Sequence, residues 1–203
     1  MVQEALRQIP APATHVFLQA GVGGLAASVA GHLALVLGDR RPTVVVVEPV
    51  RATCLFETAR AGHPVKIDHT ESTVMAMLGC YEPSLVAWRA LSRIADAFMT
   101  VEEAEAVAIM RRLARPRDND PAIVAGESGG AGLAELFCAA ADVKIRDTLK
   151  LHNASTVFVI NTEGATDPAC YCELVGAGPD AVLTRAASRI AGSVMSAIPH
   201  YTL

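Results

Sequence analysis

The sequence has no long run of residues of one charge. Its 21 acidic and 17 basic residues leave a formal net charge of −4. Proteins that bind a nucleic-acid backbone or an anionic membrane surface usually concentrate basic residues in a patch. The charge pattern therefore argues against both classes of partner, and we expect the ligand to be a small molecule.

Long apolar runs are absent as well. No stretch reaches the roughly 20 apolar residues that a membrane-spanning helix needs. The first fifteen residues, MVQEALRQIPAPATH, lack the basic start and apolar stretch of a secretory signal. These absences predict a cytoplasmic protein with no membrane partner.

Cysteine is sparse and irregularly spaced. The five residues Cys54, Cys80, Cys138, Cys170 and Cys172 lack the repeated C-x-x-C spacing of a zinc site. We therefore expect no metal site, and mainly buried free thiols. Cys54 and Cys80 both fall in loop-like sequence, so a redox-linked pair is the alternative for these two.

What the sequence does contain is hydrophobic bulk in strand and helix patterns. A chain of 203 residues with 52% hydrophobic content can bury the core of one domain. The β-branched run Thr43–Val47 has no polar alternation, which is typical of a strand buried on both faces of a parallel sheet. Further strands are expected at Val16–Leu18, in DAFMTV and in STVFVIN, with an edge or short strand in HPVKI.

Helical patterns separate these strands. They are expected at Leu25–Leu37, at Arg51–Arg60, in EPSLVAWRALSRIA after Pro83, at Glu102–Leu113, and in two stretches from about Ala131 to Leu149; a polar loop covers Arg115–Pro121. Alternating strands and helices predict the α/β class, with a largely parallel sheet flanked by helices. We expect residues 1–203 to form a single α/β unit.

Four loops follow or adjoin the apolar, strand-like runs. Their sequences are QAGVGGL, EPVRATC, GESGGAG and NTEGATDPACY. Ligands of open parallel sheets bind beyond the carboxyl ends of the strands, where such loops gather. We therefore expect the four loops to converge on one site.

The glycine loop is the first candidate for binding. Gly21, Gly23 and Gly24 permit positive φ angles and remove Cβ atoms, so successive N–H groups can surround an anion at the start of the next helix. Phosphate is the natural ligand for such a loop. A tight strand-to-helix turn without a ligand is the alternative.

The spacing of this region also fits a dinucleotide site. Gly21, Gly23 and Ala26 satisfy the pattern G-x-G-x-x-A, and Glu48 ends the next strand where a ribose ligand would lie. This spacing supports an NAD-dependent oxidoreductase. A site of that kind does not account for GESGG or for NTEG after a late strand.

Five motifs in order carry a resemblance to a known family. QAGVGGLA, VVVVEPVRATCL, TVMAMLGCYEPS, AGESGGAG and VINTEGATDP are similar to the carboxyl half of diaminopropionate ammonia-lyases. These are fold-type II pyridoxal-phosphate enzymes, as are threonine deaminase and tryptophan synthase β. The resemblance implies part of the tryptophan synthase β-like fold, with pyridoxal phosphate as cofactor.

The resemblance also implies roles for particular residues. The family's phosphate-binding loop corresponds to Gly21, Val22, Gly23, Gly24 and Leu25. Thr162 corresponds to the position that places a small hydroxyl or thiol against the pyridine nitrogen. Glu127 and Ser128 would lie near the cofactor. Glu48 would then cap a nearby backbone turn instead of binding a ribose.

A Schiff-base lysine is missing from the expected place. The family's lysine lies on the amino-terminal side of the phosphate loop, whereas Lys66, Lys144 and Lys150 all follow it and match no lysine motif. We expect them to be surface residues, and we assign no catalytic residue.

The resemblance therefore implies the carboxyl-terminal portion of an enzyme that converts 2,3-diaminopropionate to pyruvate and ammonia by α,β-elimination. The chain alone would be inactive, and it would form a homodimer or associate with an amino-terminal half. The NAD-dependent oxidoreductase stays an alternative, as does a non-catalytic binding or assembly module.

Overall fold

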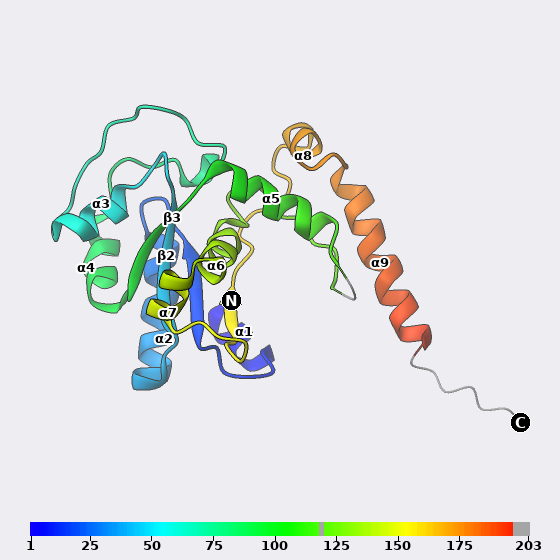
Figure 1. The fold of residues 1–203 in the computed structure, drawn as a ribbon, viewed down its shortest axis with the longest axis horizontal. Helices are drawn as coiled ribbons and strands as arrows, with labels where there is room; N and C mark the ends of the chain where they lie inside the picture. The colour runs from blue at the N-terminus through cyan, green and yellow to red at the C-terminus, as the bar shows by residue number, and fades with distance from the viewer. Residues whose placement is uncertain (118–119, 197–203) are drawn as a thin grey trace, which may run out of the picture.

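A parallel sheet forms the centre of the protein. The computed structural model describes residues 1–117 and 120–196, with side chains through residue 187. The strands are β1 (His15–Gln19), β2 (Thr43–Pro49), β3 (Ala97–Val101) and β4 (Val157–Val159), in the order β3-β2-β1-β4, and all their pairings are parallel (Figure 1). The predicted sheet is therefore confirmed.

The two middle strands are buried on both faces, as their unbroken apolar sequences predict. Val16 and Val44 pack on the face covered by α2 (Gly24–Leu37) and α4 (Leu85–Ile94). Phe17 and Val45 pack on the opposite face, which α5 (Glu103–Ala114) and α6 (Ala131–Ala141) cover. The result is a sandwich of helices, sheet and helices, the arrangement predicted for the α/β class.

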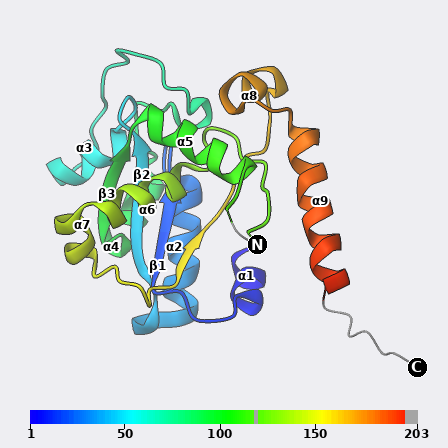
Figure 2. The same cartoon turned by 45° about the vertical axis from the view of Figure 1, so that its right-hand side comes forward.

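The remaining elements lie around this sandwich. They are α1 (Val2–Gln8), η1 (Gly38–Arg40), α3 (Cys54–Ala61), η2 (Ala76–Leu78), α7 (Val143–Leu149), α8 (Pro168–Val175) and α9 (Pro179–Ser196). A separate apolar cluster joins α5 to α8 and α9 through Met110, Tyr171, Val175 and Val182. Beyond that cluster, α9 projects away from the sheet (Figure 2). None of the described helices is long and apolar enough to cross a membrane.

Two expected elements differ from the structure. The segment HPVKI is not a strand, because its N–H groups make isolated bonds: Val65 donates to Thr58 Oγ1 and Ile67 to the carbonyl of Tyr81. The helix expected from Arg51 begins only at Cys54. The segment before Cys54 forms a turn instead, in which the Ala52 N–H donates to the carbonyl of Pro49.

Other helix boundaries agree closely with the sequence. Helix α2 spans the expected Leu25–Leu37 plus Gly24. Helix α4 starts after Ser84, whose side chain accepts the Ala87 N–H, so Pro83 lies just before the helix. Two residues of the predicted polar loop, 118–119, lie outside the described residues.

Candidate functional site

A cavity of about 460 Å³ lies at the carboxyl end of β1. We call it the glycine-loop pocket. Its lining comes from four segments of chain: Gln19 to Leu25, then Met77, Leu78 and Cys80, then Ser128, and finally Thr162, Glu163, Gly164 and Thr166. All six residues to which the sequence assigned cofactor contacts, Gly21, Val22, Gly23, Gly24, Leu25 and Thr162, are among them.

Three of the four loops expected to converge do so here. EPVRATC does not line the pocket, and the segment Met77–Cys80 takes its place. This segment lies close against the glycine loop, because a Cβ atom on Gly21 would approach Cys80 Sγ to 2.8 Å. The expectation that EPVRATC reaches the site was wrong.

The glycine loop has a shape that only small residues allow. Gly23 has a φ of 95°, in the left-handed region, and a Cβ there would contact Leu55, Ala87 and Leu91 at 3.0–3.2 Å. At Gly24 a Cβ would meet nothing within 4 Å, so the first turn of α2 is open. The loop is therefore packed behind Gly23 and open at Gly24.

The loop also presents unused hydrogen-bond donors. Among the described residues, no acceptor receives the N–H groups of Gly21 to Leu25. They lie at the start of the 14-residue helix α2, whose dipole favours an anion. The geometry suits a phosphate group, because both the N–H groups and the helix N-terminus attract negative charge.

Thr162 lines the same pocket and is held by Gln19. The Gln19 side chain, only 2% exposed, points its Nε2 atom at Thr162 Oγ1 over 2.8 Å. The same nitrogen lies 2.7 Å from the Ile160 carbonyl oxygen and 3.1 Å from that of Gly129. One amide thus joins the end of β1 to the GESGG and NTEG loops.

Glu163 joins these two loops a second time. Its Oε2 atom accepts the Ser128 N–H at 2.9 Å, and Oε1 accepts the Thr166 hydroxyl at 3.1 Å. Its backbone carbonyl also accepts the Gly126 N–H at 2.9 Å. A Cβ on Gly129 would lie 2.7 Å from that carbonyl oxygen, so the close approach requires glycine.

The two GESGG residues that sequence reasoning placed near the cofactor have different positions. Ser128 is 2% exposed and lines the pocket, where its Oγ accepts the Met77 N–H at 3.2 Å. Glu127 does not line the pocket. Burial raises the pKa of Glu127, and the nearby Glu163 and Asp167 raise it further.

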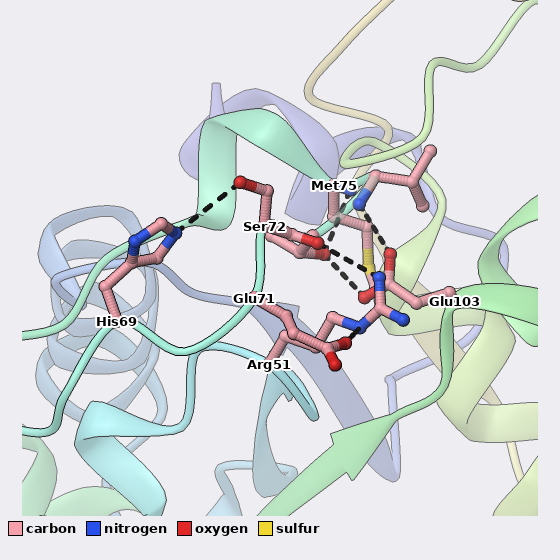
Figure 3. A network of polar contacts seen from close by, with 8 residues as sticks. Arg51, His69, Glu71, Ser72, Met75 and Glu103 are labelled. Carbon is pink, nitrogen blue, oxygen red and sulfur yellow. Dashed lines mark hydrogen bonds and ion pairs between the residues drawn. The ribbon is translucent and has the colours of Figure 1, made fainter.

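A polar network secures the long loop that leads to Met77. Glu103, in the first turn of α5, accepts the Thr73 hydroxyl at 2.7 Å and the Val74 N–H (Figure 3). In the same network (Figure 3), Arg51 pairs with Glu71 at 3.1 Å and donates to the Ser72 carbonyl. The pocket wall at Met77–Cys80 therefore depends on contacts outside the pocket.

Glu48 has the capping role that the resemblance implied. It is 1% exposed, and its two oxygens accept the N–H groups of Leu55 at 2.9 Å and Phe56 at 2.7 Å, at the start of α3. Burial raises the pKa of Glu48 to about 7, while these N–H donors act in the opposite direction. Its carboxylate is thus committed to α3 and does not line the glycine-loop pocket.

The five cysteines are free, as expected, but they are less buried than expected, since Cys172 is exposed and three others are half-buried. Cys54 is buried next to Glu48, with 3.5 Å between its Sγ and the Glu48 Oε1. Burial raises the pKa of the Cys54 thiol, and the Glu48 carboxylate raises it further. Across the described residues, no group of three or more metal-ligating side chains gathers.

A second cavity, of about 520 Å³, lies between α5 and α6. Three of its four arginines have guanidinium partners: Arg111 donates to the Leu174 carbonyl, Arg115 to that of Gly176, and Arg112 lies over the Phe137 ring at 4.3 Å. These guanidinium groups join elements of the fold. The glycine-loop pocket, with its unused N–H donors, is the stronger candidate for a ligand site.

Sequence reasoning assigned no role to Gln19, Glu163 or the Met77–Cys80 segment, although all three lie within motifs that carried the resemblance. A weak signal existed for Gln19, since it is a polar residue at the end of an otherwise apolar strand. The roles of the other two are recognised only through contacts between segments that are distant in sequence.

Comparison with known proteins shows the family to which the chain belongs. The family model described as pyridoxal-phosphate dependent enzyme matches residues 1–163. Diaminopropionate ammonia-lyase from Escherichia coli (strain K12) is 36% identical over 182 residues, which cover 88% of this chain and 46% of that protein. The chain thus spans about half the length of the curated relatives it matches.

Solved structures show the same likeness. One similar structure is the crystal structure of diaminopropionate ammonia lyase from Escherichia coli in complex with an aminoacrylate-PLP azomethine reaction intermediate. Its TM-score with this chain is 0.76 and its sequence identity is 35%. The match covers 85% of this chain and 44% of that one. The processed form of threonine deaminase isoform 2 from Solanum lycopersicum shares the fold, with a TM-score of 0.70 and 21% identity, covering 87% of this chain and 48% of that one. The predicted resemblance in sequence and fold is confirmed.

Proposed function

Because the chain belongs to the family of pyridoxal-phosphate-dependent enzymes, we propose that the glycine-loop pocket binds this cofactor for a diaminopropionate ammonia-lyase reaction. The observation that carries the proposal is the pairing of two groups in one pocket. Unused N–H groups belong to Gly21 to Leu25, and both these residues and Thr162, with its hydroxyl, line the same cavity. A molecule with a phosphate and an aromatic nitrogen has one partner for each.

The glycine loop binds the phosphate in this proposal. Its N–H groups donate to phosphate oxygens, and the N-terminus of α2 adds a favourable dipole. Gly24 leaves room for the phosphate, because a Cβ there would have no protein neighbour within 4 Å. These features fit the cofactor's charged end and require no side-chain cation.

Thr162 contacts the pyridine nitrogen. A hydroxyl is neutral, so it leaves that nitrogen largely unprotonated, whereas a carboxylate would favour the protonated form. When bound, the cofactor's ring withdraws electrons from the α-carbon of the amino-acid substrate. The neutral Thr162 contact moderates this withdrawal, which suits β-elimination better than transamination.

The proposed reaction is α,β-elimination of 2,3-diaminopropionate to pyruvate and ammonia. This chain provides the phosphate contact and the nitrogen contact. Among the described residues no lysine lines the pocket; Lys66 is exposed and pairs with Glu82 at 3.6 Å. We therefore propose that the Schiff-base lysine and the general base come from an amino-terminal half, either within a longer chain or from an associated one, and that the assembly is a cytoplasmic homodimer.

The absence of a lysine from the described pocket wall also favours a second candidate, a non-catalytic module that retains a phosphate site. One assay distinguishes the portion of an enzyme from the non-catalytic module. With pyridoxal phosphate and 2,3-diaminopropionate, the isolated chain should release no pyruvate, and addition of the amino-terminal half should restore release only if the chain is part of an enzyme. Turnover by the isolated chain that disappears on Lys66→Ala or Lys144→Ala would contradict the assignment of the lysine.

Calorimetry with 4′-deoxypyridoxine 5′-phosphate tests the pocket itself. This analogue has the phosphate and ring nitrogen but no aldehyde, so it forms no adducts with surface lysines. Gly24→Asp should weaken its binding at least tenfold, since the new carboxylate repels phosphate, while an acidic residue in the first turn of α2 maintains stability. Gly24→Asn is the matched neutral control: it fills the same space without the charge, so it should bind more weakly than the wild type and more tightly than Gly24→Asp. If Gly24→Asp bound the analogue as tightly as the wild type does, the phosphate site would be refuted.

A further inference from the structure

Gln19 holds a fixed orientation beneath the pocket. Its Nε2 atom faces three acceptors: the carbonyl oxygens of Ile160 and Gly129, and Thr162 Oγ1. Carbonyl oxygens can only accept hydrogen bonds, so the amide must present its nitrogen on this side. The amide direction is therefore determined by two backbone groups that cannot change roles.

The surrounding backbone leaves Gln19 little freedom to turn. The residue ends β1, where its backbone pairs in register with Val47. A Cβ on Gly132, in the first turn of α6, would lie 3.0 Å from Gln19 Oε1. Strand, helix and two carbonyl groups thus hold the side chain in place.

This arrangement decides how Thr162 can bond. A hydroxyl has one proton to donate and two lone pairs that accept. The Gln19 amide has two protons for three acceptors. Its two shortest contacts, 2.7 Å to the Ile160 carbonyl and 2.8 Å to Thr162 Oγ1, receive one each, and the Gly129 carbonyl at 3.1 Å shares one of them. Donation to Thr162 Oγ1 uses a lone pair and leaves the hydroxyl proton available. Within the part of the chain that the structure describes, that proton has no acceptor, and Thr162 lines the pocket.

We propose that Gln19 is a positioning residue that makes Thr162 a hydrogen-bond donor toward the cofactor's ring nitrogen. The inference rests on the proposed function, since it assumes that the nitrogen lies at Thr162. A nitrogen that receives a hydrogen bond is stabilised without its proton, whereas an accepting hydroxyl would stabilise the protonated ring. Gln19 thus influences the electron-withdrawing strength of the ring without touching substrate.

The test measures the ring nitrogen directly. The ultraviolet absorption of bound 4′-deoxypyridoxine 5′-phosphate, followed against pH, reports the pKa of that nitrogen. We expect the wild-type chain to lower this pKa relative to the free analogue. Thr162→Val, which removes the hydroxyl, should raise it again by about one unit, the equivalent of one hydrogen bond.

Gln19→Met should produce a similar rise, and combining it with Thr162→Val should add little, because both act through one hydroxyl. Thr162→Ser retains the hydroxyl and should retain the wild-type pKa. Gln19→Asn provides a second variant should Gln19→Met fail to fold: it retains an amide for the buried carbonyl groups, but its shorter side chain withdraws the nitrogen from Thr162 Oγ1, so the pKa should rise as well.

The possible failures are distinguishable. If Thr162→Val shifts the pKa but neither Gln19 variant does, Gln19 is only structural and the inference is overturned while the proposed function stands. If the analogue binds and Thr162→Val has no effect, the nitrogen contact is wrong, and the inference is overturned with it. An analogue that does not bind the wild-type chain overturns both.

Discussion

The Glu163 carboxylate lies 2.9 Å from the backbone nitrogen of Ser128, so that one buried side chain connects the NTEG loop to the GESGG loop. Its second oxygen accepts the Thr166 hydroxyl at 3.1 Å. Ser128 in turn accepts the Met77 N–H, which connects a third segment of the pocket wall. The lining thus forms one hydrogen-bonded unit.

Removal of this carboxylate should destabilise the protein. Glu163→Ala leaves the buried Ser128 N–H without its acceptor, and we expect a loss of about 2 kcal/mol in the free energy of unfolding. Glu163→Gln can still accept from Ser128 through its oxygen and donate to Thr166 through its nitrogen, so it should lose less than half as much. Urea unfolding measures both values. Equal losses would indicate that the charge, not the bonding geometry, is what stabilises the loops.

The loop that leads to Met77 should depend on Glu103. Glu103→Ala removes the acceptor for the Thr73 hydroxyl and the Val74 N–H, so amide exchange over residues 73–78 should become about tenfold faster. The neighbouring Glu102, exposed and without a side-chain cap bond to α5, is the matched control, and Glu102→Ala should leave exchange unchanged. Unchanged exchange in both variants would show that the Arg51 contacts alone secure the loop.

Stability should fall with rising pH because of Glu135. This residue is 3% exposed, and burial, followed by the charge of Glu105, raises its pKa from 4.5 to about 7. Below pH 4.5 both folded and unfolded states carry the proton. Between pH 4.5 and 7 the unfolded state has released it and the folded state retains it, so the free energy of unfolding decreases as pH rises, by up to about 3 kcal/mol.

Replacing Glu135 removes this contribution. Glu135→Gln should be more stable than the wild type at pH 8 and should show a smaller loss between pH 4.5 and 7. Some dependence should remain, because the pKa of Glu48 is also raised to about 7. Chemical unfolding at several pH values measures the slope, with exposed Glu173→Gln as the control. An unchanged slope in Glu135→Gln would mean that this carboxyl group titrates normally.

The elements that could be predicted from sequence are those whose signals are local. The β-branched run Thr43–Val47 became the buried strand β2, and the Ala- and Leu-rich stretch from Leu25 became α2, because each pattern matches the burial of its own element. The strand predicted at HPVKI was wrong because pairing in a sheet depends on residues elsewhere in the chain. Its β-branched character says nothing about whether a neighbouring strand is available, and its N–H groups bond elsewhere.

The same distinction applies to the site: features that depend on a single residue could be predicted, and features that depend on distant contacts could not. The glycine loop was recognisable because the unusual φ of Gly23 is a property of one residue. The contact between Gln19 and Thr162 joins residues 143 positions apart, and a glutamine at a strand end has no specific meaning alone. The role of Met77–Cys80 in the pocket wall was missed, because contacts of the preceding residues Thr73 and Val74 to the distant Glu103 help to position it.

The central claim is that the glycine-loop pocket binds pyridoxal phosphate with Thr162 at the ring nitrogen, and not a dinucleotide with Glu48 at a ribose. One calorimetric series tests it most directly. Wild type, Thr162→Val and Glu48→Gln are each titrated with 4′-deoxypyridoxine 5′-phosphate and with NAD, after thermal melts have confirmed folding. Glu48→Gln is informative because the amide retains the side chain's shape while weakening its cap on α3.

We expect the analogue to bind the wild-type chain and to lose roughly five- to tenfold in affinity on Thr162→Val, the equivalent of one neutral hydrogen bond. Glu48→Gln should leave that affinity within twofold and should lower the melting temperature instead. Tight binding of NAD that is lost on Glu48→Gln and unaffected by Thr162→Val would contradict the account.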